Sequence, residues 1–508
     1  MVSAFLLVLL GAAFLRLRGV AVRSLWLDEF CTWHVSRLPL LESLRWGPEL
    51  TIPPLYQFIL RLMSADPHPP EELLRMPAVV AGVLTVAGGG WLGWMLAGRS
   101  TGLALALLLA FNVPQIEYSR EARPYTLLVL LSVLSTACWF RLVTRASRGG
   151  VGLYVLTATA VVYAHYLSML VILAHAAWWL AYLYGQRRAP RRWLPGIALL
   201  MTLVMCMPIV LRPIVCRESI SQALEWLEPA GMGQRLRTLG QVTYGIPWVV
   251  AGLVPAIIIP ALRHLPAKLW DQADCGPGAS TSPDKQAARD RGRLAQHLES
   301  IAPGIGLLLM WLACSWVGLL GLSVVAGPLG VVRYALPAAV PALLLPLVVA
   351  RAVHRVLPLV IAGLVVGLTS PRWIDFGTEV EPGFRELTKY IGENLDPSRE
   401  AVVLVRDTAS FPHWPEVDRL ALAYYPIAGR EVHELDARLE GALAEGSILR
   451  DPRALYLIVF RAEVESLVRA AGRRFTRIHV DGESFSRLLF APYRLLRVAP
   501  LSEGNGAA

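Results

Sequence analysis

Two adjacent carboxylates, Asp28 and Glu29, stand in the segment RSLWLDEF, directly after the first apolar run of the chain. Negative charge at the mouth of a membrane helix is costly, which makes these acids a functional hypothesis by default. A carboxylate in such a place can accept a proton from a hydroxyl or amine, or orient that nucleophile. Adjacent helical residues point about 100 degrees apart, so the two acids need not share one role. The alternative interpretation is that both acids cap the helix expected at TWHVSRLPLLESL.

Three arginines at the ends of apolar runs could complement an anionic group. Arg120 and Arg123 lie in SREARPY, and Arg333, followed by Tyr334, begins a later run. The planar guanidinium matches phosphate oxygens and can stabilise charge on a leaving phosphate. The alternative for each arginine is an interfacial residue that keeps its charge in water. Arg123 and Arg333 are the stronger candidates for phosphate ligands, ahead of Arg120.

Tyr56, His165 and Tyr166 are further candidates for contacts with substrate. Tyr56 follows Pro53-Pro54 and would face the substrate cavity if this loop folds back over it. We expect His165 between two spans near the outer surface, where its ring could contact sugar or phosphate. The alternatives are a hydrogen-bonded interfacial histidine and tyrosines of the aromatic belt.

The elements that must position these residues are membrane helices. The 508 residues are 55% hydrophobic and only 17% charged, whereas about one quarter of the residues in soluble domains are charged. A helix needs about 20 apolar residues to cross the hydrocarbon core. The sequence predicts about eleven spans, at 2–22, 77–98, 101–118, 125–143, 151–165, 167–184, 194–212, 247–263, 303–325, 334–350 and 356–370.

The charges in the gaps between spans predict orientation. Alternate gaps are basic and poor in acids, as cytoplasmic loops are, and they explain the net charge of +10 without a nucleic-acid partner. The amino terminus is then cytoplasmic and the segment after the last span is extracytoplasmic. We expect a multi-pass protein of the plasma (inner) membrane. The basic gaps carry Arg99, Arg141, Arg145, Arg148, Arg187, Arg188, Arg191, Arg192, Arg263, Lys268, Arg351 and Arg355.

The last segment, 371–508, changes character. Strand-like runs at 402–405 and 455–460 alternate with segments of helical spacing, which predicts a small extracytoplasmic α/β domain. The predicted fold class is therefore mostly α, a polytopic membrane helical bundle at 1–370 with this domain at its end. External loop 23–76 carries the acidic motif, and 265–302 reads as a flexible cytoplasmic loop. No glycine-rich phosphate loop follows a strand, so a nucleotide site is not predicted.

The order of these motifs resembles the GT-C glycosyltransferases over nearly the whole chain. The similarity is greatest to bacterial relatives of the protein O-mannosyltransferases (glycosyltransferase family 39) and to the lipid A aminoarabinose transferases. RSLWLDEF is similar to the first external loop of that family. Further similar segments are PPLYQFILRLM at 53–63, YSREARPYTLLVLL at 118–131, YAHYLSMLVI at 163–172, RYALPAAVPALLL at 333–345 and PGFRELTKYIGENL at 382–395.

The resemblance implies an enzyme that moves a sugar from a polyprenyl-phosphate carrier to an acceptor outside the cytoplasm. Asp28 would activate the acceptor as general base, with Glu29 as its electrostatic partner or as a helix-start residue. A lipid-linked donor also suits the chain because it has no Asp-x-Asp motif for nucleotide sugars. With no evident second nucleophile, we expect inversion at the anomeric carbon. Protein, lipid and cell-envelope glycan all stay open as the acceptor.

Metal dependence is the other open point. None of the six cysteines forms a CxxC pair and none of the ten histidines an HExxH motif, so no dedicated cage is signalled. The resemblance to oligosaccharyltransferases raises a divalent ion on Asp28 and Glu29 as an alternative, but we predict no metal and no cofactor. Two other functions stay in view, namely a lipid or solute transporter and a membrane scaffold with an external binding domain.

Overall fold

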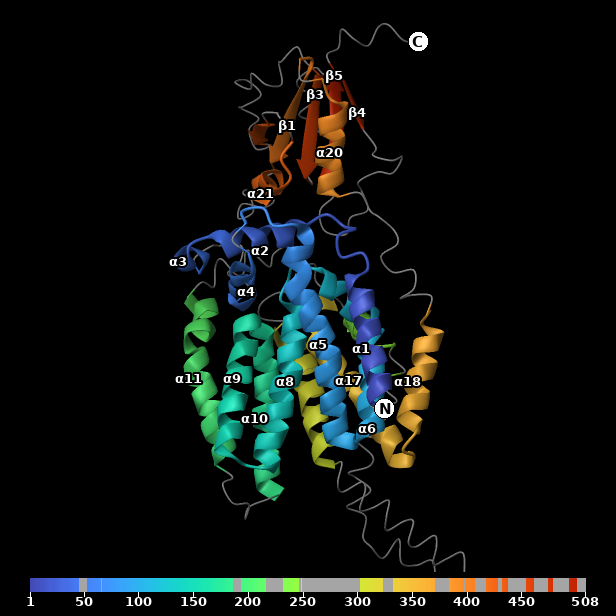
Figure 1. Ribbon diagram of the computed structural model, residues 1–508. Helices are drawn as coiled ribbons and strands as arrows, with labels where there is room; N and C mark the ends of the chain where they lie inside the picture. Colours follow the sequence, from blue (N-terminus) through green and yellow to red (C-terminus); the bar gives the residue numbers. More distant parts are fainter. Residues whose placement is uncertain are drawn as a thin grey trace, which may run out of the picture. The chain divides into compact units, whose positions relative to one another are not determined.

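The computed structural model describes residues 1–44, 53–64, 66–185, 193–215, 232–245, 248, 302–322, 332–370, 383–396, 398–406, 417–427, 432–436, 454–460, 474–477 and 493–499. The chain forms two compact units (Figure 1). Unit 1 comprises Met1–Arg18, Thr51–Tyr56 and Arg75–Phe376, and unit 2 comprises Gly19–Leu50, Gln57–Leu74 and Gly377–Ala508. Helices α4 (Leu55–Met63) and α5 (Glu71–Ala97) each begin in one unit and end in the other.

Unit 1 is a bundle of helices. Figure 1 shows α5, α8, α9, α10 and α11 running side by side along most of their length. Besides α5, its elements are α1 (Val2–Leu17), α6 (Arg99–Ala110), α7 (Val113–Glu117), the 3-10 turn η2 (Tyr118–Arg120), α8 (Tyr125–Thr144), α9 (Arg148–Ala164), η3 (Tyr166–Ser168), α10 (Met169–Gly185), α11 (Leu194–Val215), α13 (Met232–Val242), a helix at Ala302–Leu322, α17 (Val332–Val353) and α18 (Leu357–Leu368).

Six of the described helices are long and apolar enough to cross a membrane, or seven if the bent pair Arg99–Ala110 and Val113–Arg120 forms one span. Two other apolar helices, α1 and α18, are shorter. The predicted span at 247–263 and the predicted loop at 265–302 lie outside the described residues, apart from Trp248 and Ala302. The structure confirms a mostly helical, multi-pass membrane chain. By length and composition, its described helices do not reach the predicted count of about eleven spans.

A sharp bend separates α6 from α7. The two helical parts meet at 66°, and the side chain of Asn112 caps the first turn of α7. Arg16 of α1 is almost completely buried and donates hydrogen bonds to the carbonyl oxygens of Leu109 and Ala110, at 3.1 and 3.2 Å. A helix end leaves such carbonyls without partners in the same helix, so Arg16 stabilises the end of α6.

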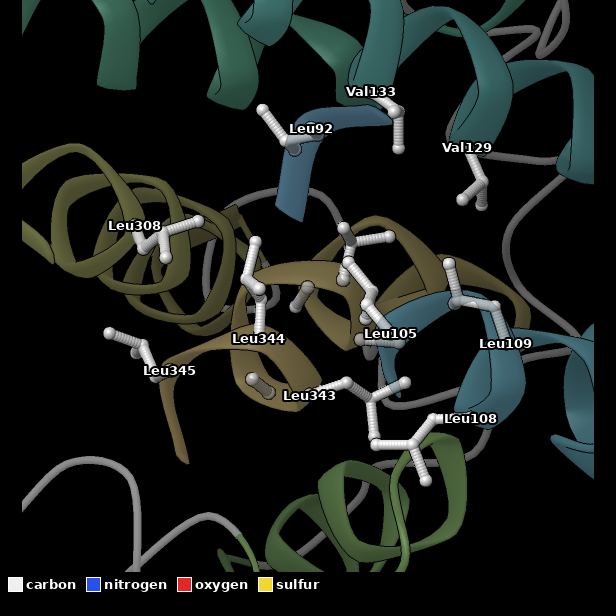
Figure 2. Close-up of a cluster of buried hydrophobic side chains, with 14 of the residues drawn as sticks. Leu92, Leu105, Leu108, Leu109, Val129, Val133, Leu308, Leu343, Leu344 and Leu345 are labelled. Atoms are coloured by element: carbon white, nitrogen blue, oxygen red, sulfur yellow. The ribbon is translucent and has the colours of Figure 1, made fainter. Parts of the chain in front are cut away.

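The centre of unit 1 is an apolar cluster around α17. Most residues of this helix are buried, and it contains three prolines that a membrane helix can accommodate where neighbours pack around it. Figure 2 shows leucines and valines from five helices pointing toward one another. This packing fixes the helix whose first turn carries Arg333. The labelled residues are Leu92, Leu105, Leu108, Leu109, Val129, Val133, Leu308, Leu343, Leu344 and Leu345.

Unit 2 contains a five-stranded mixed sheet with the strand order β2-β1-β3-β5-β4. Strand β1 pairs in parallel with β2 and β3, and β5 is antiparallel to β3 and β4. Val402 sits opposite both Val432 and Tyr456, and the β1 residues 401–404 are buried. The strands are β1 (Glu400–Arg406), β2 (Val432–Asp436), β3 (Ala454–Phe460), β4 (Arg474–Arg477) and β5 (Tyr493–Ala499).

Besides parts of α4 and α5, four described helices belong to unit 2, and two of them precede the sheet by a long stretch of sequence. Helices α2 (Leu27–Arg37) and α3 (Leu40–Ser43) belong to the loop after α1, whereas α20 (Phe384–Asn394) and α21 (Val417–Tyr424) come from the C-terminal segment. The sequence divides the chain at residue 370 and leaves loop 23–76 with the membrane domain. In the structure, most of that loop belongs to the same compact unit as the C-terminal segment, and the predicted domain boundaries stay a prediction.

Candidate functional site

Three side chains of unit 1 meet around the ring of Tyr125, and a fourth, that of Tyr334, packs against two of them. We call Arg123, Tyr125, His165, Arg333 and Tyr334 the Tyr125 cluster. The guanidinium carbons of Arg123 and Arg333 lie 6.0 and 5.8 Å from the centre of the Tyr125 ring. The imidazole of His165 lies 5.9 Å from the ring of Tyr125 and 5.9 Å from that of Tyr334. Two guanidinium groups, one imidazole and two phenol rings therefore lie close together.

The ends of three helices, α8, α9 and α17, bring this cluster together. Arg123 belongs to the turn between η2 and α8, and Tyr125 is the first residue of α8. His165 links the end of α9 to η3, and Arg333 lies in the first turn of α17. Arg123, His165 and Arg333 are 5%, 4% and 3% exposed. A charged residue buried at the end of a membrane span is a functional-site hypothesis by default, and two such arginines lie beside one ring here.

His165 is neutral in this setting. Its Nδ1 accepts a hydrogen bond from the backbone N–H of Leu167 at 3.2 Å, so the ring proton sits on Nε2. Nε2 is buried and has no hydrogen-bond partner among the described residues. The cluster thus presents a neutral N–H donor beside two guanidinium groups, which is a suitable set for an anionic oxygen.

The other three candidates of unit 1 lie in different settings. Arg120 donates from Nη2 to the carbonyl oxygen of Leu15, at the end of α1. Tyr166 is half-buried and packs against the apolar group that includes Leu128 and Val161. Tyr56 is fully buried in α4. Roles for these three residues in binding substrate stay predictions.

The acidic motif lies in unit 2, at the start of α2. Trp26 occupies the N-cap position, and its side chain has no oxygen that could cap the helix. The Glu29 carboxylate, three residues later, accepts a hydrogen bond from the Trp26 backbone N–H at 3.3 Å. Glu29 is fully buried, and this position matches its interpretation as a helix-start residue. Asp28 is half-buried in the same first turn, and its backbone carbonyl accepts the Thr32 hydroxyl at 2.9 Å. The catalytic role of Asp28 stays a prediction.

No metal site is apparent in the part of the chain that the structure describes. No group of three or more His, Cys, Asp or Glu side chains there could hold an ion. The four described cysteines, Cys31, Cys138, Cys206 and Cys314, form no disulfide with one another, and three of them are buried. Metal independence stays a prediction for the chain as a whole.

Comparisons with known proteins find similar folds among membrane glycosyltransferases. No family model matches the sequence, and no curated protein matches it. The structure of ArnT from Cupriavidus metallidurans bound to undecaprenyl phosphate is 15% identical, with a TM-score of 0.46, over 98% of this chain and 97% of that one. The apo oligosaccharyltransferase of Archaeoglobus fulgidus is 11% identical, with a TM-score of 0.48, over 94% and 69%.

A further structure of the Archaeoglobus fulgidus enzyme, in complex with Zn and sulfate, is 12% identical with a TM-score of 0.46 and covers 82% of this chain and 61% of that chain.

Sequence reasoning missed the residue at the centre of the cluster. Tyr125 follows Arg123 and Pro124 in the segment that suggested the two arginines. The ring of Tyr118 packs edge-on against it at 5.6 Å. An aromatic residue at the start of a span is usually assigned to the interfacial belt, so the only local signal for Tyr125 was its closeness in sequence to Arg123. The contacts of Tyr125 with Arg333 and His165 arise from the packing of segments that are far apart in the sequence.

Proposed function

We propose that this chain is a membrane glycosyltransferase that moves a sugar from a polyprenyl-phosphate donor to an acceptor outside the cytoplasm. The observation that carries the proposal is the Tyr125 cluster, in which two buried arginines and a buried N–H donor surround one ring. Such a group suits a phosphate whose negative charge grows as it leaves the sugar. The sugar and the acceptor are not specified by these residues.

Each member of the cluster has a distinct part in holding the donor phosphate. Arg123 and Arg333 supply charge-assisted hydrogen bonds to its oxygens, which are about twice as strong as neutral ones. His165 donates its Nε2 hydrogen and adds no charge, so it does not repel the two guanidinium groups. Tyr125 keeps both cations near one ring through cation–π attraction, which is worth about 1 kcal/mol for each pair.

Asp28 is the general base of this proposal. The acceptor oxygen or nitrogen attacks the anomeric carbon, and the bond from that carbon to the phosphate oxygen breaks as the new bond forms. The lipid phosphate leaves with the electron pair, and the Asp28 carboxylate takes the acceptor proton. A single displacement of this kind inverts the anomeric carbon. Glu29 supports the reaction by holding the first turn of α2, and no metal ion is required.

The two ends of unit 1 support one direction of the chain in the membrane. Tyr125 and Arg333 lie at the starts of α8 and α17, whereas the basic residues Arg141 and Arg351 lie near the ends of the same helices. The turn at Gly98 is also close to Arg351, since a Cβ there would lie 3.8 Å from the Arg351 Nε. The basic ends favour the cytoplasm. We therefore propose that the Tyr125 cluster faces the opposite side, with a cytoplasmic amino terminus and an extracytoplasmic C-terminal domain.

The test of the donor site measures binding of undecaprenyl phosphate to the purified protein in detergent. Removing one charged donor costs about 1.5–3 kcal/mol, so Arg123→Gln and Arg333→Gln should each weaken binding by about 10- to 100-fold. Arg141→Gln changes an exposed arginine at the other end of α8 and should leave affinity unchanged. Equal affinity of all four proteins would remove the cluster as the donor site.

The test of the reaction compares cells that express the active protein with cells that express Asp28→Asn. Mass spectrometry of their extracted glycolipids and glycoproteins should show a sugar-bearing product only in the first set. Undiminished product in the Asp28→Asn cells would exclude Asp28 as the base and leave the donor-site assignment to be judged on binding alone.

A further inference from the structure

Arg385 of α20 joins three separate segments of unit 2. Its Nη1 lies 2.9 Å from the Glu71 carboxylate, at the first residue of α5, and its Nη2 lies 2.8 Å from Glu386. The same guanidinium donates to the backbone carbonyls of Ala21 and Val22 at 3.1 and 3.0 Å. Those two carbonyls belong to the short connection between α1 and α2. One C-terminal side chain thus holds the chain just before the acidic motif.

Tyr425, directly after α21, adds a second tie to the same connection. Its hydroxyl donates to the Glu71 carboxylate and accepts the backbone N–H of Leu25 at 2.9 Å. Burial, followed by the neighbouring Glu71 charge, raises the pKa of the Tyr425 phenol, so the hydroxyl stays protonated and can donate at neutral pH. Leu25 lies two residues before the start of α2.

Aromatic packing holds the face of α2 that carries Phe30. The ring of Phe30 lies 6.2 Å from that of Phe384 in α20 and 5.9 Å from that of Tyr425, both edge-on. Trp33, one turn further along α2, packs edge-on against Tyr424 at 5.0 Å. The indole N–H of Trp33 also donates to the carbonyl of Pro67 at 3.1 Å. Helix α2 is therefore fixed both at its entrance and along one face.

We propose that Arg385 and Tyr425 are positioning residues that set the place and direction of the first turn of α2, and through it the carboxylate of Asp28. This inference rests on the proposed function, because it gives the C-terminal segment a part in the reaction only if Asp28 is the base. Displacing a reacting group by about 1 Å can cost about 100-fold in rate. The C-terminal segment then acts as the support of the catalytic helix.

The hydrogen bonds of Arg385 and Tyr425 can position the start of α2 because they end on backbone atoms of the segment that precedes it. Arg385 and Tyr425 contact the carbonyls of Ala21 and Val22 and the N–H of Leu25, so they fix the path of the main chain. The buried Glu71 carboxylate meets both residues and couples them. Lys389, by contrast, pairs with Glu393 on the exposed face of α20 at 3.8 Å. This pair offers a matched control on the same helix.

The experiment compares Arg385→Gln, Arg385→Lys, Tyr425→Phe and Lys389→Ala in the full-length purified protein. Hydrogen exchange of the backbone amides of α2 reports its local stability directly. We expect about tenfold faster exchange in the first turn of α2 for Arg385→Gln, a smaller change for Tyr425→Phe and none for Lys389→Ala. Arg385→Lys retains the charge but loses the planar fork, so it should restore only part of the protection.

The second readout separates positioning from general stability. Arg385→Gln should lower the rate of sugar transfer at saturating donor by about 10- to 100-fold, without changing the affinity for undecaprenyl phosphate. Unchanged exchange in α2, or an equal loss of donor affinity in Arg385→Gln and Tyr425→Phe, would overturn the inference. Should Arg385→Gln fail to fold, Tyr425→Phe removes a single hydroxyl and carries the same two measurements.

The two proposals fail in different ways. Transfer that persists in Asp28→Asn would refute the base but would leave the exchange measurements on α2 interpretable. Normal exchange and normal transfer in Arg385→Gln and Tyr425→Phe would refute positioning while the loss of transfer in Asp28→Asn stood.

Discussion

The guanidinium carbon of Arg333 lies 5.8 Å from the centre of the Tyr125 ring, although the two residues belong to the first turns of α17 and α8. Arg123 approaches the same ring at 6.0 Å. The ring therefore contacts both guanidinium groups. The distance between Arg333 and the ring is set by the packing of α17 against α8, whose first turns are far apart in the sequence. The following predictions test this relationship and the elements around it.

Replacement of Tyr125 tests whether its ring supports the donor site. Tyr125→Leu should weaken binding of undecaprenyl phosphate by about 5- to 30-fold, because its two cation–π contacts together contribute about 1–2 kcal/mol. Tyr125→Phe keeps the ring and should bind within about twofold of the unaltered protein. Both affinities are measured by titration in detergent. A loss in Tyr125→Phe as large as that in Tyr125→Leu would show that the hydroxyl, and not the ring, is responsible.

The two acids of the motif should respond differently to loss of charge. Asp28→Asn should reduce sugar transfer by about 100-fold or more, because general-base catalysis is removed. Glu29→Gln keeps an oxygen that can accept the Trp26 N–H and should retain most activity, whereas Glu29→Ala should lose about 1 kcal/mol of stability with the cap. Transfer rates and Tm values separate these outcomes. Equal loss of transfer in Asp28→Asn and Glu29→Gln would assign both carboxylates to the reaction.

Gly82 of α5 is required by the side chain of Arg16. A Cβ at this position would lie 2.8 Å from the Arg16 Nε and would also meet the Ser119 side chain. Gly82→Ala should therefore displace Arg16 from the end of α6 and cost about 1–3 kcal/mol. Gly363→Ala in α18 meets no atom within 4 Å and should be neutral or slightly stabilising. The comparison of Tm values in detergent checks both, and an unchanged Tm for Gly82→Ala would contradict this packing.

Local sequence predicted the character of the helices and many of the residues at their ends. Long apolar runs have few folded alternatives in a bilayer, so α5, α8 and α17 could be placed closely from composition. The helix-start interpretation of Glu29 also follows from local structure, since it depends on a residue three positions away. Arg123, His165 and Arg333 could be selected because charged or polar groups at span ends are costly and few. The break between α6 and α7 was missed, because the predicted span 101–118 was read as continuous.

Partners that are distant in sequence could not be predicted, because hydrophobic periodicity is similar for lipid-facing and buried helices. The sequence by itself determined a helical membrane chain, an acidic motif after α1 and a set of candidate cations. Only the tertiary structure decided that Arg123, His165 and Arg333 meet at Tyr125, that Arg120 contacts the end of α1, and that α2 is held by Arg385 and Tyr425. Packing between non-neighbouring segments sets these contacts, and no local pattern of residues encodes it.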